Sequence, residues 1–404
     1  MPATSLPVLK LKRGEEQRLR AGHLWVFSNE VDTAATPLTG FEPGALVQVV
    51  DARGQFVGHA YVNPATLIAA RILSRSQARP VDAQLLVQRL RQARELRERL
   101  YPGPYWRWVY GESDGLPGLV LDRFGDVVVG QVATLGMERL KPLVEQAVRR
   151  VLDPPVFVWK NDSGARALER LAPAFEACWG EAPTEIEVVE TLADGRALHY
   201  TAALAAGQKT GWFYDQAANR AALPRFLSPG ARVLDVCSYA GAWAVTALAA
   251  GAATATCVDA SEPAIERAAA NARRNGFEVA LRRGDAFEVL AALLAEGARF
   301  DAVVVDPPAF IKRRKEFPQG LAAYRKLNQL ALRLLDRDGL LVSCSCSWHL
   351  GADDLLGAIQ AAARHTDRFV QLLQAGGQSP DHPVHPAIPE TRYLKAFFCR
   401  VSRE

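Results

Sequence analysis

Apolar and polar positions alternate with different periods along the chain, and the periods predict where strands and helices lie. Between residues 6 and 74, short alternating segments broken by Gly and Pro predict β-strands, including a hairpin that turns at residues 52–54. Residues 81–100 carry apolar positions at helical spacing and are followed by a proline-containing break. Residues 106–200 mix strand patterns with one helical pattern at 138–152. The first half of the chain is therefore expected to be β-rich and then α+β.

The pattern changes from residue 231 onward, where short apolar strands alternate with helical segments. Such alternation predicts βαβ units, a parallel sheet and right-handed crossovers. A last apolar segment at 392–401 is expected to add an antiparallel strand. A chain of 404 residues exceeds one ordinary core, so several domains are expected. We place them at 1–76 (a small β-rich, barrel-like domain), 77–200 (α+β) and 201–404 (an α/β, doubly wound, Rossmann-like domain).

Composition places the protein in the globular class, with 49% hydrophobic and 23% charged residues. The N-terminal segment has no apolar stretch before a cleavage site, and no apolar run approaches the length of a membrane span. The six cysteines are too scattered to form a disulfide framework, which fits a reducing compartment. The expected location is therefore the cytoplasm.

Charge is modest overall but uneven along the chain. The formal net charge is +4, yet lysine and arginine gather in runs at residues 10–20, 89–99 and 312–315. Single runs of this kind are usually solvated surfaces, whereas several of them on one chain favour an anionic partner such as RNA. Residues 10–20 and 312–315 are our candidates for contacts with RNA phosphates.

Acidic residues stand at the ends of the first three predicted strands of the last domain. Asp235 and Asp259 are 24 residues apart, and Asp285 follows the third strand. Ligands of doubly wound sheets bind at the carboxyl ends of the strands, where an acidic residue at this separation takes a ribose hydroxyl. The first turn contains Gly241 but neither GxGxxG nor a Walker lysine, so it provides poorly for a pyrophosphate. S-adenosylmethionine is therefore favoured over a dinucleotide, although each aspartate could instead cap a helix.

The fourth strand ends in DPPAF, which begins at Asp306. Consecutive prolines stiffen the backbone and lack amide donors, so they hold the Asp306 carboxyl group at the strand tip, facing a substrate. Asp or Asn followed by prolines at this position is a feature of amino- and base-methylating enzymes of the class I methyltransferase fold. The motif is specific within that fold and weak outside it.

Two cysteines, Cys344 and Cys346, close the fifth strand in the segment CSCS. Zinc needs more ligands than the segment offers and alternate strand residues are held apart, so neither a metal site nor a disulfide is expected. Both side chains would face the same side if the strand continued through both. Either cysteine could be core filler, since free Cys is commonly buried. The position of Cys346 beside Asp306 at the sheet rim favours a nucleophile.

Pyrimidine methylation would give a thiol at this position a purpose. Carbon 5 of cytosine is too weak a nucleophile to take a methyl group directly, but a thiolate that adds to carbon 6 activates it. A base then removes the proton from carbon 5, and the thiolate leaves. Asp306 would stabilise the adduct at ring nitrogen 3 and the amino group. The target base would have to be unstacked to reach such a pocket.

The motifs together resemble those of the RlmI/RlmO-type methyltransferases, which make 5-methylcytidine in bacterial 23S ribosomal RNA. The resemblance extends over nearly the whole chain. The segments that carry it are GHLWVFSNEV, DGLPGLVLDRFGD, WKNDSGAR, GQKTGWFYDQAANR, LDVCSYAGAWAV, VDASEPAIERAAANARRNG, DPPAF and CSCS. The resemblance implies an N-terminal PUA domain, which is a small RNA-binding barrel, then a central α+β domain and a class I methyltransferase domain. It also implies S-adenosylmethionine as cofactor and 23S ribosomal RNA or a large-subunit precursor as partner.

The resemblance implies roles for particular residues as well. The residues implied to bind the cofactor are Gln216, Asp235, Ser238, Gly241, Asp259 and Asp285. Asp235, Ser238 and Gly241 would line its methionine end, Asp259 the ribose and Asp285 the adenine. The residues implied in catalysis are the nucleophile Cys346 and, under the substrate ring, Asp306. Other residues implied to border the cofactor are Lys209, Phe213 and Asp215.

Two other interpretations stay open. The same fold could methylate guanine or a protein side chain, where DPPAF suffices and no thiol is needed, but the presence of Cys346 counts against this. The chain could instead be a non-catalytic RNA-binding or ribosome-assembly factor, but carboxylates at all the strand ends count against that. The sequence does not identify the modified cytidine, the state of the RNA, the proton-abstracting base or the role of Cys344. The oligomeric state is also open, a homodimer being one option.

Overall fold

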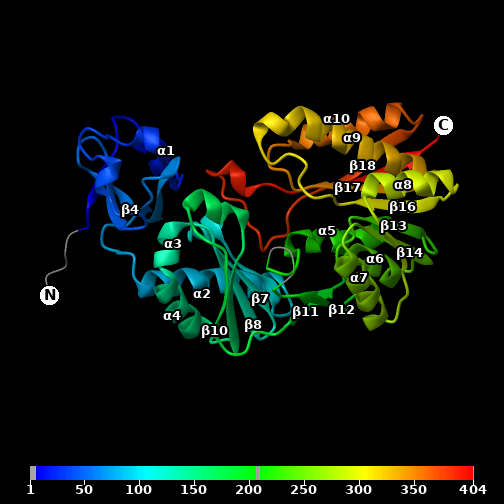
Figure 1. Cartoon of the computed structure of the whole chain (residues 1–404), viewed down its shortest axis with the longest axis horizontal. Coiled ribbons are helices and arrows are strands. Elements are labelled where there is room, and N and C mark those ends of the chain that lie inside the picture. The colour runs from blue at the N-terminus through cyan, green and yellow to red at the C-terminus, as the bar shows by residue number, and fades with distance from the viewer. Residues whose placement is uncertain (1–5, 206, 208–209, 404) are drawn as a thin grey trace. The chain divides into compact units, whose positions relative to one another are not determined.

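The computed structural model describes residues 6–205, 207 and 210–403 (Figure 1). The chain divides into two compact units. The first unit takes in the chain up to Ile186, together with Ala203–Trp212 and Asp381–Thr391. The second unit holds Glu187–Ala202, Phe213–Pro380 and the chain from Arg392 onward. The expected three-domain division at residues 76 and 200 stays a prediction.

The first unit contains two five-stranded sheets, with strand orders β1-β3-β4-β5-β2 and β10-β9-β8-β7-β6. Its strands are β1 (Val8–Lys10), β2 (Trp25–Phe27), β3 (Leu46–Val50), β4 (Phe56–Val62), β5 (Ile68–Ser74), β6 (Tyr105–Tyr110), β7 (Leu119–Phe124), β8 (Val127–Val132), β9 (Val156–Asn161) and β10 (Ala174–Trp179). Its helices are α1 (Glu16–Arg20), α2 (Ala83–Leu100), α3 (Leu135–Arg139) and α4 (Lys141–Val151). The predicted hairpin is confirmed as the antiparallel pair β3 and β4.

The predicted helix at residues 81–100 is confirmed as α2, whereas the one at 138–152 is divided. Asp82 caps α2 because its carboxylate accepts a hydrogen bond of 2.9 Å from the amide of Leu85. The second pattern forms α3 and α4, which meet at Leu140. Pro142 lies in the first turn of α4, where its missing amide costs no helical hydrogen bond. A proline inside a helical pattern therefore marks a new helix start here.

The second unit is built on a seven-stranded sheet with the order β15-β14-β13-β16-β17-β19-β18. Its strands are β13 (Arg232–Val236), β14 (Thr254–Asp259), β15 (Ala280–Arg283), β16 (Phe300–Val305), β17 (Leu335–Ser345), β18 (Phe369–Gly376) and β19 (Lys395–Ser402). Its helices are α5 (Ala217–Ala222), α6 (Ala242–Ala249), α7 (Glu262–Arg274), α8 (Ala286–Ala295), α9 (Phe317–Leu334) and α10 (Ala352–Arg364). A two-stranded sheet of β11 (Glu185–Thr191) and β12 (Ala197–Ala203) lies mostly in this unit.

The predicted parallel sheet and the late antiparallel strand are both confirmed. Strands β13 to β17 pair in parallel, and β19 runs antiparallel to β17 and β18. Helices α8, α9 and α10 cover one face of this sheet and α5, α6 and α7 the other (Figure 1). Each face carries its own apolar core because alternate strand residues point to opposite sides, as Val233 and Leu234 do.

No element was predicted for residues 352–376, where α10 and the edge strand β18 lie. Strand β18 leaves Phe369, Leu372 and Leu373 exposed, so it lacks the alternation by which a half-buried strand is recognised. None of the helices in the described ranges is long and apolar enough to cross a membrane.

Candidate active site

The carboxyl ends of the parallel strands meet at one rim of the sheet, where backbone hydrogen bonds tie them together. The amide of Ser238, after β13, donates to the carbonyl of Val258 in β14 at 3.0 Å. The amide of Asp306, after β16, donates to the carbonyl of Val236 in β13 at 3.2 Å. Backbone hydrogen bonds alone therefore fix the ends of β13, β14 and β16 against one another.

The turn between β13 and α6 has an unusual backbone. Cys237, Tyr239 and Gly241 have φ values of 63°, 48° and 76°. These values lie in the left-handed region of the backbone, which residues other than glycine rarely adopt. A Cβ at Gly241 would lie 2.8 Å from the Cβ of Ala268 on α7, so only glycine fits there. The turn is held in a strained, tightly packed form, which is typical of a ligand-binding loop.

Asp235 is fully buried at the end of β13. One carboxylate oxygen accepts a 3.1 Å hydrogen bond from the amide of Ala244, and the other has no partner among the described residues. Burial raises the pKa of Asp235 to about 8, and the charges of Asp306 and Asp259 add to the rise. Ser238 Oγ likewise is buried and has no nitrogen or oxygen partner in the described part of the chain. A buried carboxylate oxygen without a partner indicates a place for a polar, cationic ligand.

Asp259 and Asp285 stand at the next two strand ends. The carboxylate of Asp259 accepts hydrogen bonds of 2.9 Å from the amides of Tyr239 and Ser261, so it braces the turn after β13. Asp285 caps α8 by accepting from the amides of Phe287 and Glu288 at 2.9 and 3.3 Å through one oxygen. The capping role foreseen for these aspartates is therefore present at Asp285, whose second oxygen makes none of these bonds.

Asp306 is held by a network that the sequence did not reveal. Gln216 Nε2 donates to both carboxylate oxygens of Asp306 at 3.0 Å, and Trp243 Nε1 donates to one of them at 3.3 Å. Asn219 in turn donates to Gln216 Oε1 at 2.7 Å, which fixes the orientation of the Gln216 amide. Burial raises the pKa of Asp306 to about 6, although the Trp243 hydrogen bond opposes the rise. In this structure Gln216 therefore orients the predicted catalytic carboxyl group.

The other residues of the same motif also lie near this rim. Phe213 packs edge-on against Tyr239 of the strained turn, with ring centroids 5.2 Å apart. Asp215 is buried, and its carboxylate accepts a hydrogen bond from Tyr393. Lys209 lies outside the described residues.

The two cysteines of the CSCS segment have different surroundings. Strand β17 ends at Ser345, so the condition under which both thiols would face one side is not met. Cys344 is fully buried in the core around β13 and β16, and burial raises its pKa well above the ordinary value. Cys346 follows the strand and is only half-buried. In register, Val305 lies opposite Ser343, which brings Asp306 and the CSCS segment to the same rim.

The serines on either side of Cys346 fix its backbone. Ser345 Oγ donates to the hydroxyl of Tyr324 on α9 at 2.9 Å, and Ser347 Oγ lies 2.9 Å from the same hydroxyl. Ser347 Oγ also accepts from the amide of Ile311, which joins the segment to the loop after DPPAF at 3.2 Å. All of these hydrogen bonds are buried, so the backbone that carries the half-buried Cys346 is held rigidly.

A buried lysine adjoins the thiol. Lys395 begins β19, and its Nζ donates to the carbonyls of Ser347 and Tyr393 at 2.6 and 2.9 Å. Burial lowers the pKa of Lys395 to about 8, while interaction with Cys346 raises it in part. Sequence reasoning missed Lys395, Tyr324, Trp243 and Asn219. Trp243 and Asn219 carried a local signal, since Trp243 lies two residues after Gly241 and Asn219 three residues after Gln216, in motifs already considered.

The predicted cofactor residues fit S-adenosylmethionine in chemistry. The ligand carries an ammonium, a sulfonium and a ribose diol. The rim offers the partnerless oxygen of Asp235 and the hydroxyl of Ser238, followed by Asp259 at the next strand end. Gly241 has no side chain, so the turn can pack closely against Ala268. These residues and Asp285 lie around one rim, and Gln216 contacts Asp306; the cofactor role of Gln216 stays a prediction.

Comparison with known families and structures agrees with the fold. The profile of the S-adenosylmethionine-dependent methyltransferase family matches residues 123–399, and that of the PUA-like domain matches residues 9–75. A similar solved structure, SMU.776 complexed with SAH, has a TM-score of 0.82 and 20% identity over 98% of this chain and 100% of that one. This likeness extends the shared fold over nearly the whole length.

Curated relatives match over the same length. The ribosomal RNA large subunit methyltransferase I of Erwinia tasmaniensis is 33% identical over 97% of this chain and 99% of its own. The protein of the same name from Salmonella arizonae is 33% identical over 98% of both chains. With its PUA-like domain and its S-adenosylmethionine-dependent methyltransferase domain, the chain belongs to the family of ribosomal RNA large subunit methyltransferase I.

Proposed function

We propose that this protein methylates carbon 5 of a cytidine in 23S ribosomal RNA through a covalent adduct with Cys346. The names of the curated relatives support large-subunit ribosomal RNA as the substrate. The observation that carries the cytosine-5 chemistry is the contrast between the two thiols. Cys344 is sealed in the core, and Cys346 is half-buried at the rim that also carries Asp306. Guanine methylation would need no such thiol.

The bound cofactor supplies an electrophilic methyl group, and Asp235, Ser238, Gly241 and Asp259 would hold it. The thiolate of Cys346 adds to carbon 6 of the cytosine, so that a sulfur–carbon bond forms and the electron pair moves to carbon 5. Once carbon 5 carries the methyl group, a base removes its proton, the electron pair returns to the ring and the sulfur–carbon bond breaks. The ring regains its double bond and Cys346 its thiolate.

Asp306 and Lys395 assist the adduct in different ways. A carboxyl group whose pKa lies at about 6 is poised to share a proton with ring nitrogen 3, where negative charge develops when sulfur adds. Gln216 and Trp243 hold that group in place by hydrogen bonds. The ammonium of Lys395 favours the thiolate form of Cys346, because a nearby cation stabilises a thiolate.

The test combines nucleoside analysis with adduct trapping. Unmodified 23S ribosomal RNA is incubated with S-adenosylmethionine and the protein, and its nucleosides are separated by mass spectrometry. We expect 5-methylcytidine with the wild type and none with Cys346→Ala. RNA containing 5-fluorocytidine should remain bound to the wild type in a denaturing gel, because the fluorine at carbon 5 cannot leave as a proton does.

The matched control is Cys344→Ala, which removes the neighbouring buried thiol. It should retain methylation and adduct formation while losing about 1 kcal/mol of stability, as expected for a small cavity in a core. A methylated guanosine as product, or full activity in Cys346→Ala, would contradict the proposal.

A further inference from the structure

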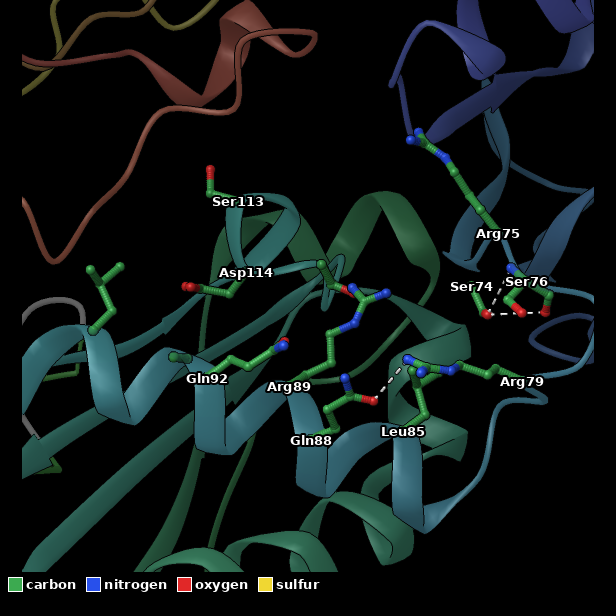
Figure 2. A pocket seen from close by; sticks show the side chains of 13 residues that line it. Ser74, Arg75, Ser76, Arg79, Leu85, Gln88, Arg89, Gln92, Ser113 and Asp114 are labelled. Carbon is green, nitrogen blue, oxygen red and sulfur yellow. Dashed lines mark hydrogen bonds between the residues drawn. The ribbon is translucent and has the colours of Figure 1, made fainter.

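The first unit contains a hollow of about 720 Å³ that the proposed mechanism does not use. It lies between the segment that follows β5, one side of α2 and the 3₁₀ turn Gly111–Asp114 (Figure 2). Its lining residues include Arg75, Arg79 and Arg89. Half of the remaining lining is serine and glutamine, and the rest is Asp114, Gly115 and the apolar residues Leu85, Ala93 and Leu96.

The three arginines have no carboxylate partners among the described residues. Arg75 donates to the carbonyl of His23 at 3.1 Å, and Arg79 donates to Gln88 Oε1 at 3.2 Å. Arg89 donates to the carbonyls of Gly115 and Leu73 at 2.6 and 2.7 Å. Since a guanidinium has five N–H donors, each arginine keeps donors for a ligand.

The single carboxylate in the lining is already neutralised. Asp114 accepts two hydrogen bonds from the buried Arg97, at 2.7 and 2.8 Å, and a third from the amide of Tyr110. Figure 2 shows Asp114 on the side of the hollow opposite Arg75 and Arg79. None of the three lining arginines forms an ion pair with Asp114. Burial lowers the pKa of Arg89, the charge of Arg75 adds to the decrease, and the charge of Asp114 opposes it.

Arg89 is also preorganised. Gly115 has a φ of 68°, and a Cβ there would lie 1.4 Å from Nη1 of Arg89. A side chain at position 115 would therefore displace this guanidinium from the turn. Ser113, which borders the same hollow, has a buried hydroxyl without a partner among the described residues. A guanidinium held in place with donors to spare is suited to an oxyanion.

We propose that this hollow binds a backbone phosphate of the RNA substrate. The proposal rests on the proposed function in taking RNA as the ligand, but not on the base that is methylated or on the thiol. A phosphate fits better than a base because the lining has guanidiniums and hydroxyls but no aromatic ring on which a base could stack. The site would position the RNA on the first unit without reading its sequence.

The experiment measures binding of unmodified 23S ribosomal RNA to the full-length protein at several salt concentrations, without cofactor. The test variant is Arg75→Gln with Arg79→Gln, which spares the structural contacts of Arg89. The control is Arg91→Gln with Arg99→Gln, two exposed arginines of α2 that do not line the hollow, so net charge changes equally. We expect about a tenfold weaker affinity and a salt slope reduced by about 1 to 2 in the test variant only.

If RNA affinity falls equally in the test and control variants, or falls in neither, the proposed phosphate site is wrong. A second variant, Gln92→Glu, adds a carboxylate to the lining without removing a contact and should weaken binding as well. Unchanged thermal unfolding shows that the variants fold. Nucleoside analysis of the wild-type reaction keeps the two proposals apart. If no 5-methylcytidine forms but RNA binding is weakened in the test variant alone, the proposed function is rejected and the phosphate site is retained.

Discussion

At the scale of single residues, burial accounts for most of the chemistry at the strand ends. Asp235 and Asp306 both have raised pKa values because they are withdrawn from water, and Lys395 has a lowered one for the same reason. The pKa values of both carboxyl groups are raised although the charge of Arg220 opposes the rise, so a cationic ligand and these groups would stabilise each other. The charges of the site therefore change when ligand binds.

Lys395 offers a prediction about the reactivity of Cys346. The lysine is cationic below pH of about 8, so its support for the thiolate is largest there. In Lys395→Met, alkylation of Cys346 by iodoacetamide at pH 7 should fall about tenfold, whereas at pH 9.5 it should approach the wild-type rate. Peptide mass spectrometry gives the rate for this cysteine alone. A reduction that is equal at both pH values would mean that Lys395 acts only by holding the backbone.

Asp235 predicts how stability changes with pH in the absence of ligand. Its pKa is about 8 in the folded protein against an ordinary value of 3.8, so between these values the folded state holds a proton that the unfolded state has lost. This contribution to stability is complete below pH 4 and is lost as the pH rises through 8. Urea unfolding of Asp235→Asn should therefore show a weaker decline between pH 5 and 8 than the wild type.

The same group predicts proton release on binding. The ammonium of S-adenosylhomocysteine favours the ionised carboxylate, so binding at pH 7 should expel a proton from Asp235. Calorimetry in two buffers with different heats of ionisation measures this proton directly. Asp235→Asn should bind about ten times more weakly, and without the release. Equal release by both proteins would assign the proton to another group.

At the scale of elements, the turn between β13 and α6 combines an unfavourable backbone with close packing. Gly241→Ala places a Cβ 2.8 Å from Ala268, whereas Gly276, with a similar φ of 79°, has nothing within 4 Å of such a Cβ. We expect Gly276→Ala to cost about 1 kcal/mol from the backbone alone and Gly241→Ala about 2 to 4 kcal/mol. Only Gly241→Ala should also weaken binding of S-adenosylhomocysteine. Similar unfolding midpoints for both would remove the packing argument.

Element positions followed from sequence because strand and helix periods are local properties. The parallel strands of the second unit and the placement of Asp235, Asp259 and Asp306 at their ends were predicted, since parity and crossover rules need no distant information. The end of β17 could not be predicted in the same way. It depends on hydrogen bonds from Ser345 and Ser347 to Tyr324, which lies more than 20 residues earlier.

At the scale of the whole molecule, distant segments complete local structures. Asp381 belongs to the first unit, where its carbonyl accepts from Arg97 and its carboxylate accepts from the amide of Arg107. The first of these contacts spans 284 residues. In the second unit, Gln216 reaches Asp306 across 90 residues. No periodic pattern records such pairs, which is why the contact between Gln216 and Asp306 could not be predicted from the sequence.

Charge distribution gives a last prediction at this scale. In the basic run at residues 10–20, Arg18 and Arg20 form ion pairs with Glu30 and Asp51, so part of that run is committed to structure. Lys312 and Lys315, by contrast, are exposed in the segment that follows DPPAF, next to the site. Replacing both by Gln should weaken binding to 23S ribosomal RNA about tenfold and lower the salt slope by about 1 to 2.

The matched control for that pair is Arg325→Gln with Arg333→Gln, which removes two exposed charges from α9 farther along the chain. Because net charge falls equally in both double variants, a purely long-range effect of charge would weaken them alike. A loss confined to the lysine pair would mean that RNA phosphates contact the mouth of the site. Combining the lysine pair with Arg75→Gln and Arg79→Gln should then lower the salt slope by the sum of the two separate changes, because contacts at independent sites release their counterions independently.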